Sequence, residues 1–239
     1  ERNVRAFGQD IQRLLQRLHI GVVGGGGTGS PTFEQLVRLG VGTISVFDGD
    51  TLADSNLSRV YTGSVADVGR NKAELAAELA HWIGLGTRVV VHPRHITEEQ
   101  TAKALRDCDI VLACTDKARP RGILVQLALR YYIPVLDLAV LIDSKDGVLK
   151  GVEGRVTTLF PGAACLFCRE RITPGRIAAE SLPEDRRQAL AAEGYAPELG
   201  IPDPAVIAFT SAVASQAVAE LLHRLSGFMG DDRTSTEVL

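Results

Sequence analysis

The sequence predicts an α/β fold in which a doubly wound, mostly parallel sheet is extended by antiparallel strands and covered by helices on both faces. Three observations predict it. Apolar runs of strand length alternate with amphipathic stretches of helix length as far as residue 138. A glycine-rich loop, residues 24–29, joins the first run to the helix after it. Beyond Asp137 the alternation gives way to two longer segments around Asp146-Gly147, which is typical of a hairpin.

Each element is expected from its own pattern of apolar residues. Ile11, Leu14 and Leu18 recur at helical spacing and predict an N-terminal amphipathic helix. Residues 161–204 hold six of the ten prolines, so we expect this stretch to be largely irregular. The expected strands lie at 20–23, 43–47, 88–91, 109–113 and 133–138, followed by hairpin segments at 139–145 and 148–159, and the expected helices lie at 5–18, 33–39, 71–82, 97–105, 119–130 and 205–226.

The chain organisation indicates one domain over residues 1–239. No internal repeat or low-complexity linker divides it, and residues 169–204 are expected to form a long crossover loop that covers the site. The first residue is Glu1 rather than methionine, and the last follows a polar stretch, 230–237. We therefore expect a fragment of a longer protein.

Composition excludes several classes of protein. The net charge of -3 and a pI near 6.0 argue against a general nucleic-acid binder. No run of 18 apolar residues exists that could span a membrane, and the polar N-terminus is unlike a signal peptide. Four cysteines, two of them in a Cys-x-x-Cys pair, fit a reducing compartment. We expect a cytoplasmic protein.

The glycine-rich loop predicts a nucleotide site. A glycine turn between strand and helix brings backbone N–H groups and the positive helix end to a phosphate, and Gly25, Gly26, Gly27 and Gly29 are the candidate residues. Asp48 follows Gly29 by 19 residues, where an acidic side chain accepts hydrogen bonds from a ribose diol. Taken alone, this Rossmann-like pattern fits NAD, FAD, S-adenosylmethionine or ATP, or a turn that only packs helix against strand.

Polar residues after Asp48 favour a triphosphate. A terminal Gly-Lys-Ser/Thr of the Walker type is absent, so cations from elsewhere must neutralise the phosphates of bound ATP. Asn56, Arg59 and Lys72 supply an amide and two cations. Each cation taken singly also fits an ordinary solvated side chain, so the interpretation depends on their joint spacing.

Asp116 is the candidate magnesium ligand. It follows the strand at 109–113, at the sheet edge where doubly wound folds bind ligands. A carboxylate beside a triphosphate is repelled unless a cation lies between them, which suggests Mg²⁺. The alternative is an N-cap for the helix that starts near Ala118, and the two roles are compatible.

These motifs together resemble those of the HesA/MoeB/ThiF family, the bacterial relatives of ubiquitin-activating enzymes. The family pattern is a GxGGxG loop, an acidic residue that ends the second strand, Ser-Asn-Leu-x-Arg, a lysine, and Thr-Asp after the fourth strand. Here these elements stand, in the same order, at residues 24–29, Asp48, residues 55–59, Lys72 and Thr115-Asp116. The resemblance spans roughly residues 5–226.

The resemblance implies an adenylyltransferase that binds ATP and Mg²⁺. In the family the C-terminal glycine carboxylate of a ubiquitin-like or sulfur-carrier protein attacks the α-phosphate, and pyrophosphate leaves. By motif match Asp48 holds the ribose, Arg59 and Lys72 bind the phosphates, and Asp116 coordinates Mg²⁺; Arg121 is either a supporting residue or a helix-surface arginine. The resemblance also implies a homodimer, whose partner contributes an N-terminal arginine. Arg2 and Arg5 are candidates, and neither aligns cleanly with the family position.

Cys165 and Cys168 suggest half of a zinc site. Two thiolates at this spacing hold one edge of a tetrahedral zinc ion. In the family a second Cys-x-x-Cys completes such a site, and this chain has none; the later candidate is His223. We therefore expect any zinc site to be completed outside this chain, with a redox pair as the alternative.

The sequence also predicts where the reaction stops. Some family members carry a cysteine in the crossover loop that accepts the activated carboxyl as a thioester, and residues 169–204 contain no cysteine. Cys108 and Cys114 flank an apolar strand and are predicted to be core residues. We expect the adenylate to be the final product of this chain.

Other functions remain open at this stage. A peptide, a small molecule or a modified tRNA base is an alternative carrier of the carboxylate. An NAD-dependent oxidoreductase explains the loop and Asp48, but leaves Arg59, Lys72 and Asp116 without roles. A noncatalytic scaffold for a ubiquitin-like partner leaves all the phosphate-binding residues unexplained.

Overall fold

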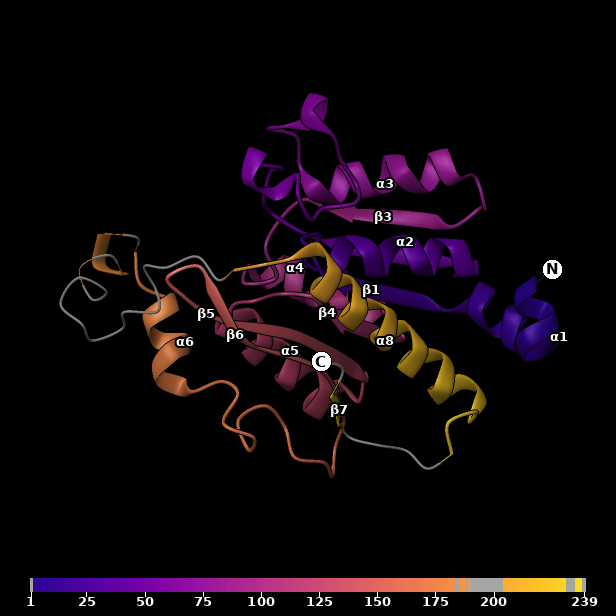
Figure 1. The fold of residues 1–239 in the computed structure, drawn as a ribbon. Coiled ribbons are helices and arrows are strands. Elements are labelled where there is room, and N and C mark those ends of the chain that lie inside the picture. Colours follow the sequence, from indigo (N-terminus) through magenta and orange to yellow (C-terminus); the bar gives the residue numbers. More distant parts are fainter. Residues whose placement is uncertain (1, 184, 188, 190–203, 231–234, 238–239) are drawn as a thin grey trace.

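A seven-stranded sheet forms the centre of the computed structural model, which describes residues 2–183, 185–187, 189, 204–230 and 235–237 (Figure 1). Its strand order is β3-β2-β1-β4-β5-β6-β7. The strands from β3 to β5 pair in parallel, whereas β6 pairs antiparallel with β5 and with β7. The predicted doubly wound sheet with an antiparallel extension is confirmed. The strands are β1 (His19–Val23), β2 (Thr43–Phe47), β3 (Arg88–His92), β4 (Ile110–Ala113), β5 (Val135–Lys145), β6 (Val148–Leu159) and β7 (Ser235–Glu237).

Helices cover both faces of this sheet, because each face is apolar and must be buried. One apolar cluster joins the first face to α1 (Arg2–Arg17), α2 (Gly29–Leu39), α3 (Lys72–Ile83) and α8 (Ile207–Ser226). A second cluster joins the opposite face to the α4 region and to α5. The bounds on this second side are Glu99–Ala104 for α4, Ala118–Tyr131 for α5 and Pro174–Glu180 for α6, which packs on α5.

The strand order places a crevice beside β1. The chain passes from β1 to β2 on one side, and β4 lies on the other. The chain leaves β1 toward β2 and leaves β4 toward β5, which are opposite directions along the sheet. The loops after β1 and β4 therefore diverge, and the crevice between them is where doubly wound folds usually bind their ligands. The glycine loop and the segment after Ala113 border this crevice.

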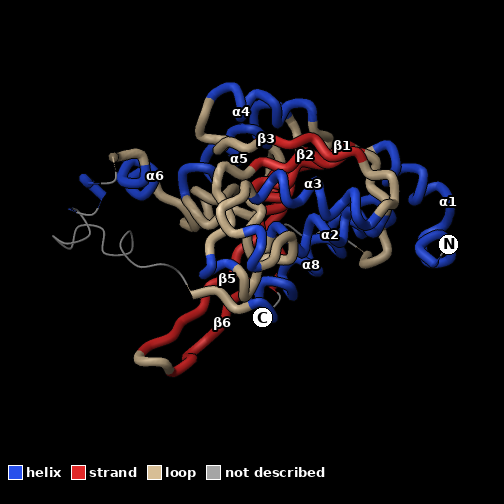
Figure 2. The backbone as a smooth tube through the Cα atoms, turned by 90° about the horizontal axis from the view of Figure 1, so that it is seen from above, coloured by secondary structure: helices blue, strands red, loops and turns tan. Residues whose placement is uncertain are grey.

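The hairpin differs from the prediction in one respect. The segments expected at 133–138 and 139–145 form one continuous strand, β5. Its first half is buried between β4 and β6, while its second half pairs with β6 alone and becomes exposed, so the apolar pattern changes in mid-strand. Figure 2 shows the distal parts of β5 and β6 projecting beyond the rest of the sheet.

Two further elements were not predicted. Helix α6 lies in the stretch expected to be irregular; it starts at Pro174, and the Thr173 hydroxyl caps it by accepting a bond from the Arg176 N–H. Strand β7 pairs with residues 155–157 of β6. Most of the expected cover loop after residue 189 lies outside the described residues.

Gly42 offers a test of how tightly α1 and β2 are packed. A Cβ atom at this position would lie 1.9 Å from the backbone oxygen of Gln16, so Gly42→Ala must displace backbone. We expect a loss of about 2 kcal/mol or more and a melting temperature lower by roughly 4–8 °C. Gly151→Ala, where a Cβ meets nothing within 4 Å, is the matched control and should change the melting temperature little. Equal melting temperatures for the two variants would contradict this packing.

Candidate functional site

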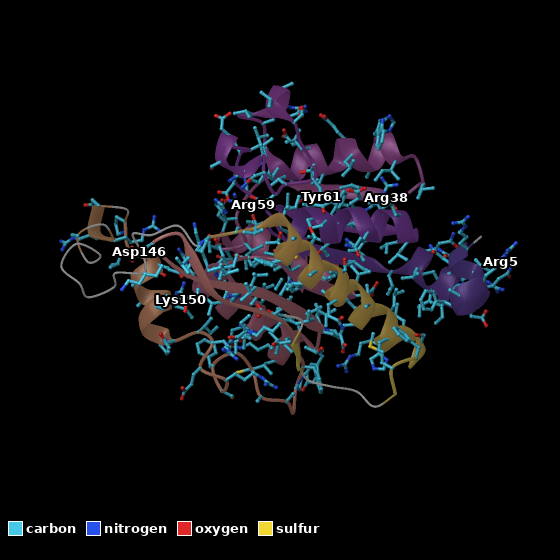
Figure 3. The ribbon with its side chains drawn as sticks, viewed as in Figure 1. Arg5, Arg38, Arg59, Tyr61, Asp146 and Lys150 are labelled. Carbon is cyan, nitrogen blue, oxygen red and sulfur yellow. The ribbon has the colours of Figure 1, made fainter. Side chains whose placement is uncertain are left out.

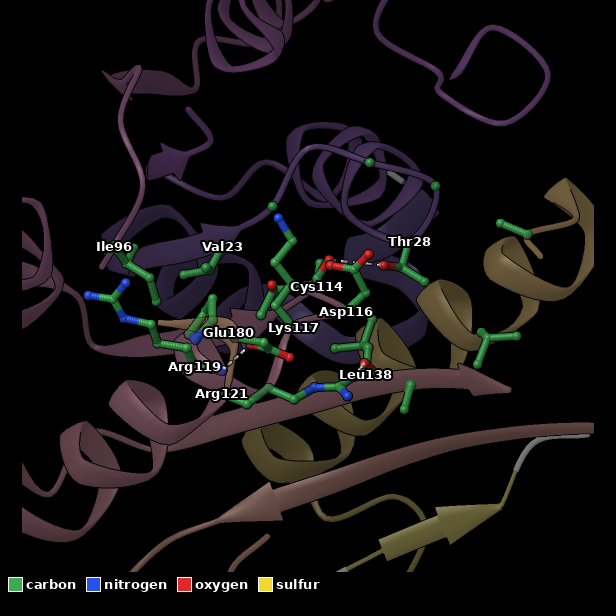
Figure 4. A pocket seen from close by; sticks show the side chains of 18 of the residues that line it. Val23, Thr28, Ile96, Cys114, Asp116, Lys117, Arg119, Arg121, Leu138 and Glu180 are labelled. Atoms are coloured by element: carbon green, nitrogen blue, oxygen red, sulfur yellow. Dashed lines mark hydrogen bonds between the residues drawn. The ribbon is translucent and has the colours of Figure 1, made fainter. Parts of the chain in front are cut away.

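A cavity of about 860 Å³ opens at the carboxyl ends of the parallel strands. Figure 4 shows the side chains that line part of it. The glycine loop, the loop after β2, the start of α3, the segment after β4 and the inner parts of β5 and β6 all contribute. The sequence-predicted residues that line it are Gly26, Gly27, Asp48, Arg59, Lys72 and Asp116.

The glycine loop is shaped by close backbone contacts. A Cβ at Gly29 would lie 1.7 Å from the Gly24 oxygen, and one at Gly24 would lie 2.7 Å from the Cys114 oxygen. Gly24 also has a φ of +93°, which favours glycine. No side chain caps the first turn of α2 at Thr28. The Ser30 N–H donates to the Gly26 oxygen and Pro31 has no N–H, so the backbone N–H groups of residues 26–29 are the candidate donors for an anion.

Asp48 lies against this loop. Its Oδ2 accepts a hydrogen bond of 2.6 Å from the Gly25 N–H, and its Oδ1 accepts one of 2.8 Å from the Asp50 N–H. Burial raises the pKa of Asp48, while the two backbone bonds and the nearby Lys72 act in the opposite direction. Each carboxylate oxygen keeps a further lone pair that can accept a hydroxyl hydrogen.

Lys72 reaches the cavity through the capping of α3. The Asn71 Oδ1 accepts bonds from the N–H groups of Ala73 and Glu74, and its Nδ2 donates to the backbone oxygens of Asp48 and Asp50. Asn71 thus ties the start of α3 to the loop after β2. The Lys72 side chain is buried, and its Nζ lies 3.6 Å from Asp50 Oδ2.

Arg59 and Asn56 differ in position. The aliphatic part of Arg59 lies over Gly27, where a Cβ would be 3.1 Å from Cδ, and its Nη1 donates to the Ser55 oxygen. Asn56 is not among the residues that line the cavity; its Oδ1 accepts a 3.3 Å bond from the Ala53 N–H and so stabilises the turn before Arg59. Figure 3 shows Arg5 on α1, at the far end of the molecule from Arg59.

Asp116 is exposed inside the cavity, and none of the described side chains pairs with it. It does not cap α5. The N–H groups of Ala118 and Arg119 instead donate to the two carboxylate oxygens of Glu180, at 2.9 and 2.8 Å. Asp116 is therefore suited to bind Mg²⁺, because its carboxylate oxygens have no hydrogen-bond partner among the described side chains. In nucleotide sites Mg²⁺ binds through one or two carboxylates together with phosphate oxygens.

Arg121 is not a surface arginine, because only 12% of its side chain is exposed. It extends beneath Asp116 toward the Leu138 backbone, whose oxygen accepts from its Nη2 at 3.0 Å (Figure 4). Its Nε lies 3.0 Å from Oδ1 of Asp137, and Nη1 of Arg155 lies 3.2 Å from the other oxygen. Asp137 lies inside the predicted apolar strand 133–138, and a carboxylate within such a run is the signal that could have identified it.

The cavity as a whole is positively charged. Nine lysine or arginine side chains and six carboxylates of the described residues line it. Since the net charge of the chain is -3, this concentration of positive charge is local. A polyanion is the ligand class that such a cavity attracts.

Two residues that follow β3 in the chain line the cavity on the side of β2. Ile96 and Thr97 line the cavity next to Val23 and Phe47, so this part of the wall is less charged than the rest. No motif in the sequence identifies Ile96 or Thr97, because an isoleucine and a threonine after a strand are common in any α/β fold.

The four cysteines differ in burial. Cys108 and Cys114 are buried, and burial raises the pKa of each thiol to about 12, so the prediction of core cysteines is confirmed. The Sγ atoms of Cys165 and Cys168 lie 3.6 Å apart. Within the described ranges no group of three or more His, Cys, Asp or Glu side chains could hold a metal ion, and His223 does not join the pair.

Within the described part of the chain, no helix has the length and apolar character needed to cross a membrane.

Comparisons with known proteins agree with this geometry. The sequence model of the ThiF family matches residues 1–239. The adenylyltransferase and sulfurtransferase UBA4 of Meyerozyma guilliermondii is 33% identical over 134 residues, which are 56% of this chain and 32% of that protein. The NEDD8-activating enzyme E1 catalytic subunit of Caenorhabditis elegans is 31% identical over 175 residues, or 71% of this chain and 40% of that protein. The chain thus spans well under half the length of these relatives.

Solved structures show the same fold. MccB of E. coli, crystallised with ATP, matches with a TM-score of 0.72 at 17% identity, over 91% of this chain and 58% of that one. The E. coli tRNA N6-threonylcarbamoyladenosine dehydratase TcdA matches with a TM-score of 0.68 at 21% identity, over 95% of this chain and 93% of that one. At these identities the similarity establishes the fold.

The raised pKa of Asp48 predicts a pH dependence of stability. The folded chain retains this proton at pH values where the unfolded chain has lost it, so stability falls as pH rises from about 4 through the raised pKa. Asp48→Asn does not ionise and should lose less stability over this window. Urea unfolding at several pH values should show the wild-type free energy of unfolding falling relative to that of Asp48→Asn. A constant difference would contradict the prediction; the control, Asp10→Asn on exposed α1, should show no such trend.

Proposed function

The chain belongs to the ThiF family, and from that premise we propose that it binds ATP with magnesium and adenylates the C-terminal carboxylate of a ubiquitin-like or sulfur-carrier protein. One observation carries the proposal: four features line the same cavity as Asp48. They are the N-terminus of α2, which has no side-chain cap, the cations Arg59 and Lys72, and the carboxylate of Asp116. An NAD-dependent oxidoreductase needs the loop and Asp48 but has no use for Arg59, Lys72 and Asp116 together.

The nucleotide is proposed to lie across the β3-β2-β1 half of the sheet. Asp48 accepts the ribose hydroxyls with its free lone pairs, and the base points toward Ile96 and Thr97 at the less charged wall. The phosphates then extend to the N-terminus of α2, where Arg59 and Lys72 are near Gly27 and Gly25. Asn56 supports the turn that presents Arg59.

Magnesium is proposed to bind Asp116 together with phosphate oxygens. When bound, it neutralises charge that develops on the leaving pyrophosphate. Among the described residues no group of three or more His, Cys, Asp or Glu side chains surrounds Asp116, which fits the few protein ligands that Mg²⁺ takes in nucleotide sites.

In the proposed reaction the residues of this chain mainly position the reactants and stabilise negative charge. A carboxylate oxygen of the carrier forms a bond to the α-phosphorus, and the bond from that phosphorus to the bridging oxygen breaks, with its electron pair leaving on pyrophosphate. The loop N–H groups, Arg59 and Lys72 hold the triphosphate so that this oxygen leaves in line. They also stabilise the negative charge on the leaving group, which preorganised donors do at no reorganisation cost.

The remaining parts of the proposal concern context. Residues 169–204 are proposed to cover the carrier tail, the whole chain to act as one adenylation domain of a longer protein, and the protein to work as a cytoplasmic homodimer. Zinc, if bound at Cys165 and Cys168, would need ligands from outside the chain. Peptide, small-molecule and tRNA-borne carboxylates are the alternative substrates.

Substitution of Asp116 tests the catalytic proposal. With magnesium, ATP and a ubiquitin-like protein that ends in Gly-Gly, the wild-type chain should exchange labelled pyrophosphate into ATP. Asp116→Ala should lower the exchange rate by about 100-fold or more without changing the melting temperature, because its carboxylate holds no partner among the described residues. Arg59→Ala and Lys72→Ala should weaken ATP binding measured by calorimetry.

The matched control is Asp10→Ala, an exposed aspartate on α1 far from the cavity, which should exchange at the wild-type rate. Exchange that survives in Asp116→Ala, or nicotinamide reduction by the wild type in place of exchange, would reject adenylation. Exchange driven by a peptide or by tRNA, and not by the protein, would reassign the substrate.

A second prediction concerns the fate of the adenylate. Cys108 and Cys114 are buried thiols with raised pKa values, and residues 169–204 contain no cysteine. Cys165 and Cys168 are more accessible, but they are not among the described residues that line the cavity, so no thioester should form. After reaction with the carrier, electrophoresis without reductant should show no covalent adduct of the two proteins. An adduct that disappears when thiol is added would be evidence against this assignment.

A further inference from the structure

A buried cluster of charges lies beside the proposed nucleotide site and has no role in binding the nucleotide. Asp137 on β5 has no exposed surface and pairs with Arg121 on α5 and with Arg155 on β6. Arg155 Nη1 also donates to the Thr157 hydroxyl. One carboxylate therefore faces two guanidinium groups, both buried or nearly so and both lining the cavity.

The neighbouring charges do not balance this cluster. Arg171 adds a third cation at the cavity wall and pairs with Glu153 at 3.3 Å. These five groups carry one more positive than negative charge, and the next carboxylate, Asp116, is exposed and is assigned to magnesium in the proposed function. Burial lowers the pKa of Arg155; Asp137 opposes this effect, and the nearby Arg121 and Arg171 add to it. A buried charge without its counter-charge is costly, so an anion that enters this part of the cavity is stabilised.

The cluster borders the phosphate end of the site from the β4-β5-β6 side. The backbone of Arg155 is on β6, but its side chain reaches back to Asp137 on β5, and Arg121 lies beneath Asp116 (Figure 4). The proposed nucleotide occupies the β3-β2-β1 half. The cluster belongs to the β4-β5-β6 half, next to Asp116, since Asp137 is the register partner of Ala113 on β4.

We propose that Arg121 and Arg155, held in place by Asp137, position the carboxylate-terminated end of an extended polypeptide substrate. The proposal rests on the proposed function, because it assigns the second substrate of the same site. Guanidinium groups bind carboxylates through two parallel hydrogen bonds, which fixes direction as well as distance. Residues 138–141 of β5 continue the cavity wall from the cluster toward the hairpin and give the chain a path along the strand.

The test uses two probes and the full 239-residue chain. The first probe is a synthetic hexapeptide that ends in Gly-Gly with a free carboxylate, and the second is the same peptide with a C-terminal amide. Calorimetric titration should show that the wild type binds the acid and binds the amide much more weakly. Arg121→Met and Arg155→Met should each weaken acid binding by about tenfold or more, while the affinity for ATP with magnesium stays within about twofold of the wild type.

Arg38→Met is the matched control, because Arg38 is an exposed arginine on α2 that pairs with Glu34 outside the cavity. It should bind both peptides as the wild type does. Thermal denaturation checks folding, since a methionine at either position unbalances buried charges. Arg155→Lys keeps the charge without the planar fork, so it should fold and bind the acid with an affinity between those of the wild type and Arg155→Met.

Three results would overturn the proposal. The first is that the wild type binds acid and amide equally, or binds neither. The second is that folded Arg121→Met and Arg155→Met bind the acid as the wild type does. The third applies where these variants do not fold, and is that Arg155→Lys binds the acid with wild-type affinity. A failure of the proposed function has a different signature. In that case the wild type does not bind ATP with magnesium, or Arg59→Ala and Lys72→Ala bind it unchanged.

Discussion

The candidate site depends on backbone segments that approach one another without side chains between them. Gly29 packs against the oxygen of Gly24, and Gly24 packs against the oxygen of Cys114 in the segment after β4. These contacts bring the N-terminus of α2 and the carboxyl end of β4 to one point. Because the packing is backbone on backbone, no compensating rotation of a side chain can restore it after a substitution. The positions of Asp48 and Asp116 both follow from this junction, since Asp48 receives the Gly25 N–H and Asp116 lies two residues beyond Cys114.

The sequence predicted the fold well where a pattern has a single physical cause. Short apolar runs that alternate with helical patterns favour buried parallel strands, and a glycine loop after such a run favours the start of a helix. The sequence also predicted which residues come together, since Asp48, Arg59, Lys72 and Asp116 all line one cavity. It did not predict how they are held: Asn71 fixes Lys72, and Glu180 caps α5, through contacts over sequence distances that local patterns do not encode.

The residues that sequence analysis missed share one property, because each acts through a tertiary partner. Arg155 is on an antiparallel strand with no motif around it, and its importance appears only when β6 is placed beside β5 and Asp137. Asn56 illustrates the reverse case. Its motif predicts a phosphate ligand, while in the structure its side chain stabilises the turn before Arg59. A motif residue can therefore support the site by shaping a loop.

The outer edge of β6 has a consequence for the behaviour of the chain in concentrated solution. In the described structure, β7 covers this edge only at residues 155–157, so the backbone groups of the projecting part face outward. Val148 and Leu149 are exposed there, at 61% and 55%. An open, partly apolar strand edge is a template for pairing with another strand. The hairpin is thus the part of this chain where a foreign strand could extend the sheet, and the Lys150 side chain beside it is the kind of charge that limits such growth.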